Sequence, residues 1–505
     1  MVEKLLIDGD NLTLEDLERV ARSDVEVALG DGVREKIVRS RAVVEAAVQS
    51  GRVVYGVTTG FGRLSEVAIP HDKIEELQLN LIRSHACGVG EPLSREETRA
   101  VTLLRANVLA KGFSGVRPIV VEQLLSLLNR RVHPVIPEQG SVGASGDLAP
   151  LSHLALVLLG EGEAELDGEV MSGAESLRRA GIEPISLKAK EGLALNNGTQ
   201  VSTGIGALVL LRAERAVATA DVAGAMSLEG LRGTPDAFHA ALQRARPHPG
   251  QKASADRLRA LLEGSEIRES HRHDDPRVQD AYSLRCMPQV HGAAANALGY
   301  IRSVLETEAN SATDNPLIFP DEDGGLVLSG GNFHAQPVAQ VMDLLAIALT
   351  DIASISERRI ERLVNPDLSD LPAFLTRSPG LSSGMMLAQI TAAALVSESK
   401  VLSHPASVDS IPTGASKEDH VSMGPSAARK ARQVLRNTET VLGIELMCAA
   451  QALEFLQPLR PGHGVERAYA AVRSRIPSLA EDRVLAPDIE VAAEMVRDGK
   501  LNFEF

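Results

Sequence analysis

The sequence predicts an all-α protein, in which a long central helical bundle accompanies a smaller, mixed but mainly helical N-terminal domain. Five long stretches carry apolar residues at three- and four-residue steps, the spacing of helices that pack against one another. Only 3% of the residues are aromatic and Trp is absent, a composition that favours helices over sandwiches and barrels. Because 505 residues exceed one ordinary core, we expect two domains, at 1–200 and 201–505.

The first 200 residues are expected to form shorter helices separated by loops rich in glycine, proline and polar residues. Asp31-Gly32 interrupts the first helical pattern, and residues 52–57 have the composition of a short strand or extended piece. Residues 162–173 are polar with weak alternation, which is typical of a small surface hairpin. The predicted helices are 15–49, 71–86, 94–111, 118–130 and about 150–160.

Long helices rich in Ala and Leu dominate the rest of the chain and predict the bundle. They are expected at 199–229, 288–309, 335–364, 384–403 and 425–457. An apolar stripe along the third of them consists of Val338, Val341, Leu345, Ala348, Ile352 and Ile355. Prolines and charged residues in 234–285 indicate a connection over the surface, and residues after 459 indicate short helices and loops.

Charge and cysteine content restrict the partners of the protein. Lys and Arg total 52 against 67 Asp and Glu, and this net charge of −15 argues against nucleic acid or an anionic membrane as partner. A small-molecule substrate is therefore expected. Cys87, Cys286 and Cys448 lie too far apart for a disulfide framework or a cysteine zinc site, which fits a reducing cytoplasm. Neither a signal segment nor an apolar run of transmembrane length is apparent, so we expect a soluble cytoplasmic protein.

Three motifs resemble known sites but are better explained otherwise. Residues 271–275 contain two histidines and two aspartates, but a loop crowded with charge is usually solvated, and we expect no metal there. Residues 143–147 resemble the elbow of serine hydrolases, yet Asp147 replaces the final glycine and no strand pattern precedes it. Residues 330–334 are glycine-rich but lack the Lys-Ser/Thr of a phosphate loop.

The stretch Gly140–Pro150 concentrates three glycines and very little side-chain bulk, so its backbone can adopt unusual conformations. It is one of three loops that directly precede a predicted helix, with residues 196–198 and 329–333. If these loops converge, three helix N-termini stabilise negative charge at one place. Alternatively, the loops are ordinary helix caps in separate parts of the molecule.

The segment Gly-Ser-Val-Gly-Ala-Ser-Gly-Asp-Leu-Ala-Pro resembles the signature of the aromatic amino acid ammonia-lyases, a family with the long-helix bundle of the fumarase/aspartase type. Further motifs that match this family in the same order are residues 55–62, 197–200, 279–286, 313–316, 331–334 and 418–423. The resemblance implies a homotetramer whose active sites are shared between subunits. Lys417 departs from the family, which usually has Gln at this position.

In this family the Ala-Ser-Gly segment cyclises, so the resemblance implies that Ala144, Ser145 and Gly146 form a 4-methylidene-imidazol-5-one group. The Gly146 amide nitrogen must attack the Ala144 carbonyl carbon, an approach that a side chain on residue 146 would obstruct. Dehydration then leaves an electrophilic alkene, which no standard side chain provides, and no external cofactor is needed. By the same match, Asp147 positions the loop during cyclisation.

The resemblance also assigns the remaining site residues. Tyr55 is implied as the base that removes the β-proton, and Tyr282 and Glu418 as further catalytic residues. Arg285 follows Tyr282 by three residues, so both face the same way if this stretch is helical. The family role of Arg285 is to hold the substrate carboxylate, although a surface ion pair is the commoner fate of an arginine. Residues matched to substrate-binding positions are His85, Asn197, Gln279, Arg285 and Phe333.

The substrate choice depends on the pair Ser84-His85 and on Glu418. Ser84-His85 resembles the version found in family members that act on histidine, where phenylalanine lyases have apolar residues and tyrosine lyases have His-Leu. An imidazole substrate has two nitrogens to satisfy, whereas Glu418 opposite a phenyl ring would remain unpaired at a cost of about 1–3 kcal/mol. We therefore expect deamination of L-histidine to trans-urocanate and ammonia. The alternatives are a tyrosine or phenylalanine ammonia-lyase, a 2,3-aminomutase, or a silent helical scaffold.

Overall fold

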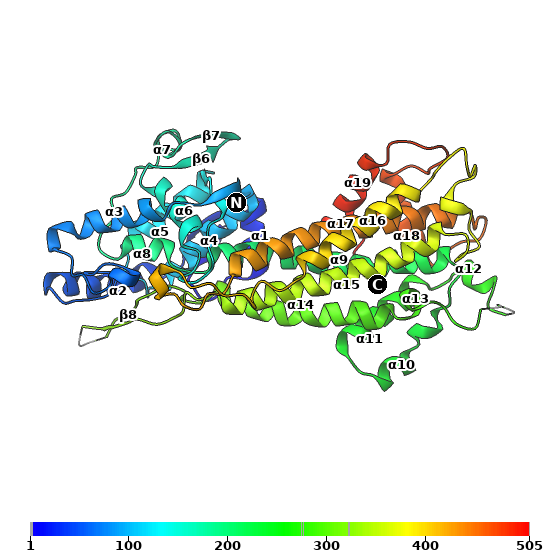
Figure 1. Ribbon diagram of the computed structural model, residues 1–505, viewed down its shortest axis with the longest axis horizontal. Helices are drawn as coiled ribbons and strands as arrows, with labels where there is room; N and C mark the ends of the chain where they lie inside the picture. The colour runs from blue at the N-terminus through cyan, green and yellow to red at the C-terminus, as the bar shows by residue number, and fades with distance from the viewer. Residues whose placement is uncertain (1–3, 274, 276, 322–323, 504–505) are drawn as a thin grey trace. The chain divides into compact units, whose positions relative to one another are not determined.

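The computed structural model describes residues 4–273, 275, 277–321 and 324–503 of the chain (Figure 1). These residues form two compact units, each assembled from three separate stretches. The first unit comprises Met1–Leu208, Arg302–Asp343 and Pro405–Arg429, and the second unit comprises Val209–Ile301, Leu344–His404 and Lys430–Phe505. The domain division expected at residue 200 stays a prediction.

The predicted fold class is confirmed, since 58% of the residues are helical and 8% are in strands. Half of the helices of the first unit begin with a capping side chain or a first-turn proline. Ser94 and Glu97 form a reciprocal capping box at the start of α4, and Pro118 occupies the first turn of α5. The helices of the first unit are α1 (Leu14–Arg22), α2 (Val33–Gln49), α3 (Ile74–His85), α4 (Arg95–Ala110), α5 (Pro118–Asn129), α6 (Leu148–Leu158), α7 (Gly173–Ala180) and α8 (Glu191–Asn196).

In the part of the chain that the structure describes, four small sheets accompany these helices. Their strands are β1 (Lys4–Ile7) parallel to β2 (Glu26–Leu29), β3 (Val89–Pro92) antiparallel to β5 (Pro137–Gln139), β4 (His133–Pro134) beside β6 (Glu163–Leu166) and β7 (Glu169–Ser172), and β8 (Leu317–Phe319) antiparallel to β9 (Leu326–Leu328). The hairpin of β6 and β7 confirms the prediction for residues 162–173.

The long helices have nearly the predicted bounds. Those that pass from one unit into the other are α9 (Gln200–Gly230), α14 (Met287–Ala309), α15 (Gln336–Val364) and α17 (Gly424–Glu454). Helices confined to the second unit are α10 (Ala240–Ala245), α11 (Pro249–Leu261), α12 (Glu266–Glu269), α13 (Tyr282–Arg285), α16 (Met386–Leu402), α18 (His463–Arg475) and α19 (Ala486–Arg497).

Buried polar bonds connect the long helices within the second unit. The Glu445 carboxylate of α17 accepts hydrogen bonds from Ser227 of α9 at 2.7 Å and from Ser356 of α15 at 2.6 Å. The His291 ring of α14 lies 2.8 Å from Asp221 of α9. Because buried polar groups must be paired, these bonds fix the register of four helices in the bundle.

The apolar stripe predicted for α15 forms core, since Val338, Val341, Leu345 and Ile352 are at most 1% exposed. Burial of such side chains contributes about 1.5–3 kcal/mol each. Judged by length and composition alone, α15 could cross a membrane, but 67% of its most apolar stretch is buried inside the protein.

Three predictions of secondary structure were wrong. Residues 26–29, expected within the first helical stretch, form the strand β2. Residues 52–57 form no strand: residues 55–57 lie in turns, and the Thr58 hydroxyl accepts from Val54 N–H at 2.9 Å and donates to the Arg52 carbonyl at 2.8 Å. These local bonds replace a strand ladder. Residues 234–285 are more than a surface connection, since α11 buries an apolar face that includes Leu258 and Leu261.

The buried histidine of β4 makes stability depend on pH. Burial, reinforced by the charge of Arg99, lowers the pKa of His133 from 6.5 to about 4. The unfolded chain therefore binds this proton more readily, so the stability contributed by neutral His133 is present above about pH 6.5 and is lost as the pH falls towards 4.

When the pH falls from 7 to 5, we expect the free energy of unfolding of the His133→Gln protein to decrease by about 2 kcal/mol less than that of the unchanged protein. Urea denaturation at the two pH values measures this difference. The exposed His71 supplies the control variant His71→Gln, whose loss should equal that of the unchanged protein. A His133→Gln protein with the same pH dependence would contradict the prediction.

Candidate active site

The loop between β5 and α6 is folded tightly around its own backbone. Gly143 and Gly146 have φ angles of 68° and 76°, in the region that glycine adopts most readily. The Ser141 hydroxyl donates to the Gly146 carbonyl at 3.1 Å and accepts from Gly143 N–H at 3.0 Å. The segment Ala144–Gly146 is thus held in a compact turn.

A second loop, which contains Asn197 and Gly198, packs against this turn. The Asp147 N–H donates to the Gly198 carbonyl at 2.7 Å, and the Asn197 side-chain amide donates to the Ser145 carbonyl at 2.7 Å. A Cβ atom on Gly146 would overlap the Gly198 backbone, so only glycine fits at this position. The two loops predicted to precede helices therefore lie in direct contact.

Of the two alternatives for the three loops, the contacts within the first unit support convergence of the helix N-termini. Gly143 of the loop before α6 accepts from Ala335 N–H, one residue before α15, at 3.5 Å. The Asp147 carboxylate accepts from Ser202 N–H of α9 at 2.8 Å and from the Ser202 hydroxyl at 3.0 Å. Burial of Asp147 raises its pKa to about 6, although the Ser202 bonds oppose that shift.

A fourth helix, α17, joins the same place, which sequence reasoning missed. Met423 N–H, just before α17, donates to the Val142 carbonyl at 2.8 Å, and the Ser422 hydroxyl donates to the Gly143 carbonyl at 3.0 Å. Four helix N-termini therefore surround the loop and supply partial positive charge.

Two cavities open beside Ser145, both lined by residues of the first unit. The larger has a volume of about 800 Å³ and the other about 680 Å³, which suits a small-molecule ligand. Predicted site residues that line both cavities are Tyr55, Ser145, Asn197 and Glu418. Ala144 and Phe333 line the larger cavity, and His85 lines the other.

Glu418 is bound directly to the loop. The Ser145 hydroxyl donates to one carboxylate oxygen at 2.7 Å, and the Thr413 hydroxyl donates to the other at 2.6 Å. Tyr55 and Gly62 also line both cavities, and the Tyr55 phenol oxygen accepts from Gly62 N–H at 3.3 Å, which orients the ring. A carboxylate and a phenol thus lie on the walls that Ser145 also lines.

His85 ends α3 and lies half-buried in the smaller cavity. Its Nδ1 atom is 3.1 Å from the Ser84 hydroxyl. Burial lowers the pKa of His85, while a hydrogen bond with Leu81 and the Glu418 charge act in the opposite direction. A neutral ring is therefore favoured at neutral pH.

Gln279, Tyr282 and Arg285 belong to the second unit, and among the described residues none of the three lines either cavity. Tyr282 is 71% exposed, and the Arg285 guanidinium lies 4.5 Å from the centre of its ring. The short helix α13 does place both on one face, as the three-residue spacing predicts. Arg285 Nε is buried without a hydrogen-bond partner in the part of the chain that the structure describes.

Sequence reasoning missed two hydroxyls and one amide of the site. Ser141 and Asn315 lie in or beside the motifs that were identified, and Asn315 accepts from Gly330 N–H at 2.7 Å in the cavity wall. Thr413 lies outside every motif, so no signal in the sequence marked it.

No group of three metal-ligating residues exists within residues 4–273, 275, 277–321 and 324–503. Asp274 of the candidate metal cluster lies outside the described residues.

This chain belongs to the aromatic amino acid lyase family, whose pattern matches residues 12–474. It is 57% identical to a histidine ammonia-lyase of Caldanaerobacter subterraneus subsp. tengcongensis over 99% of this chain and 98% of the relative. Among solved structures, histidine ammonia-lyase from Trypanosoma cruzi matches with a TM-score of 0.91 and 47% identity, over 99% of this chain and 94% of that one. Tyrosine aminomutase from Streptomyces globisporus matches with a TM-score of 0.93 and 41% identity, over 99% and 97%.

Proposed function

We propose that this lyase deaminates L-histidine to trans-urocanate and ammonia without oxidation. The observation that carries the proposal is the pair His85 and Glu418 in one cavity beside Ser145. A neutral imidazole and a carboxylate match the two nitrogens of a substrate imidazole, one as donor and one as acceptor. The names of the relatives described above support the same substrate over tyrosine and phenylalanine.

The residues Ala144, Ser145 and Gly146 fit a methylidene-imidazolone made from the chain itself. The support is the cradle formed by Gly198, which a side chain on Gly146 would fill. When formed, the group supplies an electrophile that turns the substrate amine into a leaving group. The helix N-termini around the loop stabilise negative charge that develops there.

Tyr55 acts as the base that removes the β-proton of the substrate. Its phenol borders both cavities, so it lies next to any ligand held between Glu418 and Ser145. Asn197 donates to the Ser145 carbonyl, and its side-chain oxygen is buried without a partner among the described residues. Asn197 lines both cavities and so lies where it can help to orient the substrate, and Phe333 adds an apolar ring to the wall of the larger cavity.

Arg285, with Gln279, binds the substrate carboxylate from a neighbouring subunit of a homotetramer, and Tyr282 of that subunit acts as a further catalytic residue. The exposed Tyr282 ring and the unpaired Arg285 Nε support a role at an interface between subunits. A guanidinium pairs with a carboxylate through two hydrogen bonds, which fixes both position and angle. We further propose that the tetramer is cytoplasmic.

One assay tests the substrate. The purified protein is incubated separately with L-histidine, L-tyrosine and L-phenylalanine, while ultraviolet absorbance of the acrylate product and release of ammonia are followed. We expect both signals with L-histidine alone. Activity on L-tyrosine but not on L-histidine would overturn the proposal, and β-amino acid formation would indicate an aminomutase.

The role of His85 is tested by His85→Leu, which keeps the volume but removes the imidazole. We expect kcat/KM for L-histidine to fall roughly 10–100-fold, because a buried polar substrate atom loses its partner. The hydrogen bond of His85 Nδ1 is to the Ser84 hydroxyl and not to the loop that contains Ser145. The Ser145 segment should therefore still cyclise. Steady-state kinetics provide the measurement, and His71→Leu on the exposed surface is the control. An unchanged kcat/KM would rule out His85 as a specificity residue.

A further inference from the structure

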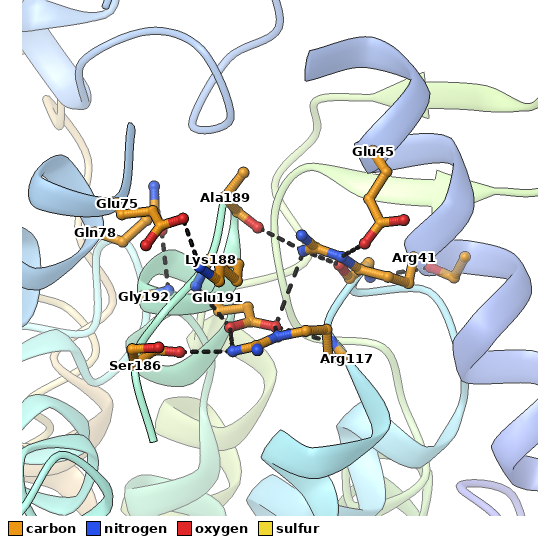
Figure 2. A network of polar contacts seen from close by, with 12 residues as sticks. Arg41, Glu45, Glu75, Gln78, Arg117, Ser186, Lys188, Ala189, Glu191 and Gly192 are labelled. Atoms are coloured by element: carbon orange, nitrogen blue, oxygen red, sulfur yellow. Dashed lines mark hydrogen bonds and ion pairs between the residues drawn. The ribbon is translucent and has the colours of Figure 1, made fainter. Parts of the chain in front are cut away.

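The helix α8 carries the loop that supports Ser145, and both of its ends are anchored by buried charges. At its first residue, the Glu191 carboxylate is completely buried and accepts from Arg117 Nε and from an Arg117 terminal nitrogen, each at 2.8 Å (Figure 2). The neighbouring Lys190 is also completely buried and lies 2.7 Å from the Asp314 carboxylate. The first end of α8 is thus fixed by two ion pairs.

The other end of α8 is held by Arg105 of α4, which has no solvent-exposed surface. Its guanidinium donates to the Ala194 carbonyl at 2.7 Å and to the Asn197 carbonyl at 2.9 and 3.2 Å, and it also bonds to Gln200. Carbonyls at a helix end lack partners inside the helix, so Arg105 satisfies groups that would otherwise be buried and unpaired.

Asn197 connects Arg105 to the loop that cyclises, through one hydrogen bond on each side. The Asn197 residue that it holds donates its side-chain amide to the Ser145 carbonyl at 2.7 Å. The following residue, Gly198, accepts from Asp147 N–H at 2.7 Å, and a Cβ on Gly198 would overlap the Arg105 guanidinium. Gly198 therefore contacts the Arg105 guanidinium as well as the Ser145–Asp147 turn.

We infer that Arg105 is a positioning residue for ring closure, because it fixes the Asn197-Gly198 platform on which the Ala144–Gly146 turn is formed. This inference rests on the proposed function. In ring closure, a bond forms between Gly146 N and the Ala144 carbonyl carbon. Two water molecules leave: the first takes the Ala144 oxygen with the Gly146 and Ser145 amide hydrogens, and the second takes the Ser145 hydroxyl with its Cα hydrogen.

An arginine is required for this role because its planar fork reaches two carbonyls and the Gln200 side chain together. A lysine keeps the charge but cannot reproduce that geometry. Burial lowers the pKa of Arg105 to about 10, so the group is still protonated at neutral pH.

The same helix offers a matched control in Arg99. This residue is 3% exposed and, like Arg105, donates to backbone carbonyls, which here are those of Val20 at 2.8 Å, Ser23 at 3.0 Å and Leu128 at 3.2 Å. None of these carbonyls belongs to the loops around Ser145. Substitution of Arg99 therefore removes a buried arginine of equal type without touching the platform.

The experiment compares Arg105→Met, Arg105→Lys, Arg99→Met and Arg99→Lys in the full-length protein. Mass spectrometry gives the ratio of dehydrated to unmodified peptide 140–150 in the soluble fraction, and thermal unfolding gives stability. We expect Arg105→Met to lower that ratio about tenfold or more, and Arg105→Lys to lower it less. Both Arg99 variants should be destabilised but fully dehydrated.

Equal dehydration in the Arg105 and Arg99 variants, whether complete or incomplete, would overturn the inference, since Arg105 would then act only through general stability. A wild-type peptide without dehydration would instead refute the proposed function. The two failures are therefore distinguishable in one data set. Because Arg105→Lys retains the buried charge, it provides the comparison if Arg105→Met yields little soluble protein.

Discussion

Replacement of Ser145 by alanine is expected to lower kcat for L-histidine by about 10³-fold or more while the protein stays folded. Without its hydroxyl, residue 145 cannot lose the second water, so no alkene and no electrophile can form. The hydroxyl also donates to Glu418 at 2.7 Å, but that bond is partly exposed and its loss costs little stability. Urocanate absorbance, the mass of the loop peptide and thermal unfolding provide the three measurements.

The matched control is Ser176→Ala, since Ser176 is also buried in the first unit and bonds only to the Gly173 carbonyl, at 2.9 Å, in the described structure. It should keep full activity and a dehydrated loop. A Ser145→Ala protein that retains activity would refute a catalytic group made from Ala144–Gly146.

Removal of the Tyr55 hydroxyl in Tyr55→Phe should lower kcat by roughly 10²–10⁴-fold, the usual contribution of a positioned general base. The KM for L-histidine should change little, because the phenyl ring still lines both cavities. The loop peptide should remain dehydrated, since the phenol oxygen bonds to Gly62 and not to the loop. Steady-state kinetics and peptide mass separate loss of the base from loss of the prosthetic group.

Tyr469→Phe is the comparison for this experiment. Tyr469 lies in α18 of the second unit and bonds to Glu454 at 3.3 Å, so its variant should keep the wild-type kcat. If Tyr55→Phe also keeps that kcat, another group must remove the proton.

The long helices were predictable because their apolar spacing extends over many turns. The prediction of 335–364 differs by one residue from α15 at Gln336–Val364. The pairing of β1 with β2 was not predictable, since each strand has only four residues and the helix α1 separates the two strands in the sequence. Short strands carry too little periodicity to be distinguished from loops.

Part of the candidate site could also be predicted. Tyr55, Ser145, Asn197 and Glu418 lie in motifs and meet around one pair of cavities. Gln279, Tyr282 and Arg285 fall in the predicted domain 201–505 together with Phe333 and Glu418. Sequence order alone could not tell that Phe333 and Glu418 belong to the first compact unit whereas the other three belong to the second.

Arg105 was not predictable for another reason. It reaches the Asn197 carbonyl across 92 residues of sequence, and nothing around it distinguishes it from other arginines of α4. Its contacts depend on tertiary packing, which no local pattern records.

The mass of the peptide that contains residues 140–150, taken from the protein as purified, tests the central claim most directly. If Ala144, Ser145 and Gly146 form the prosthetic group, this peptide is lighter than its sequence by two molecules of water, and fragmentation places the loss within these three residues. A peptide with the full mass of its sequence, from protein that deaminates L-histidine, would contradict the account.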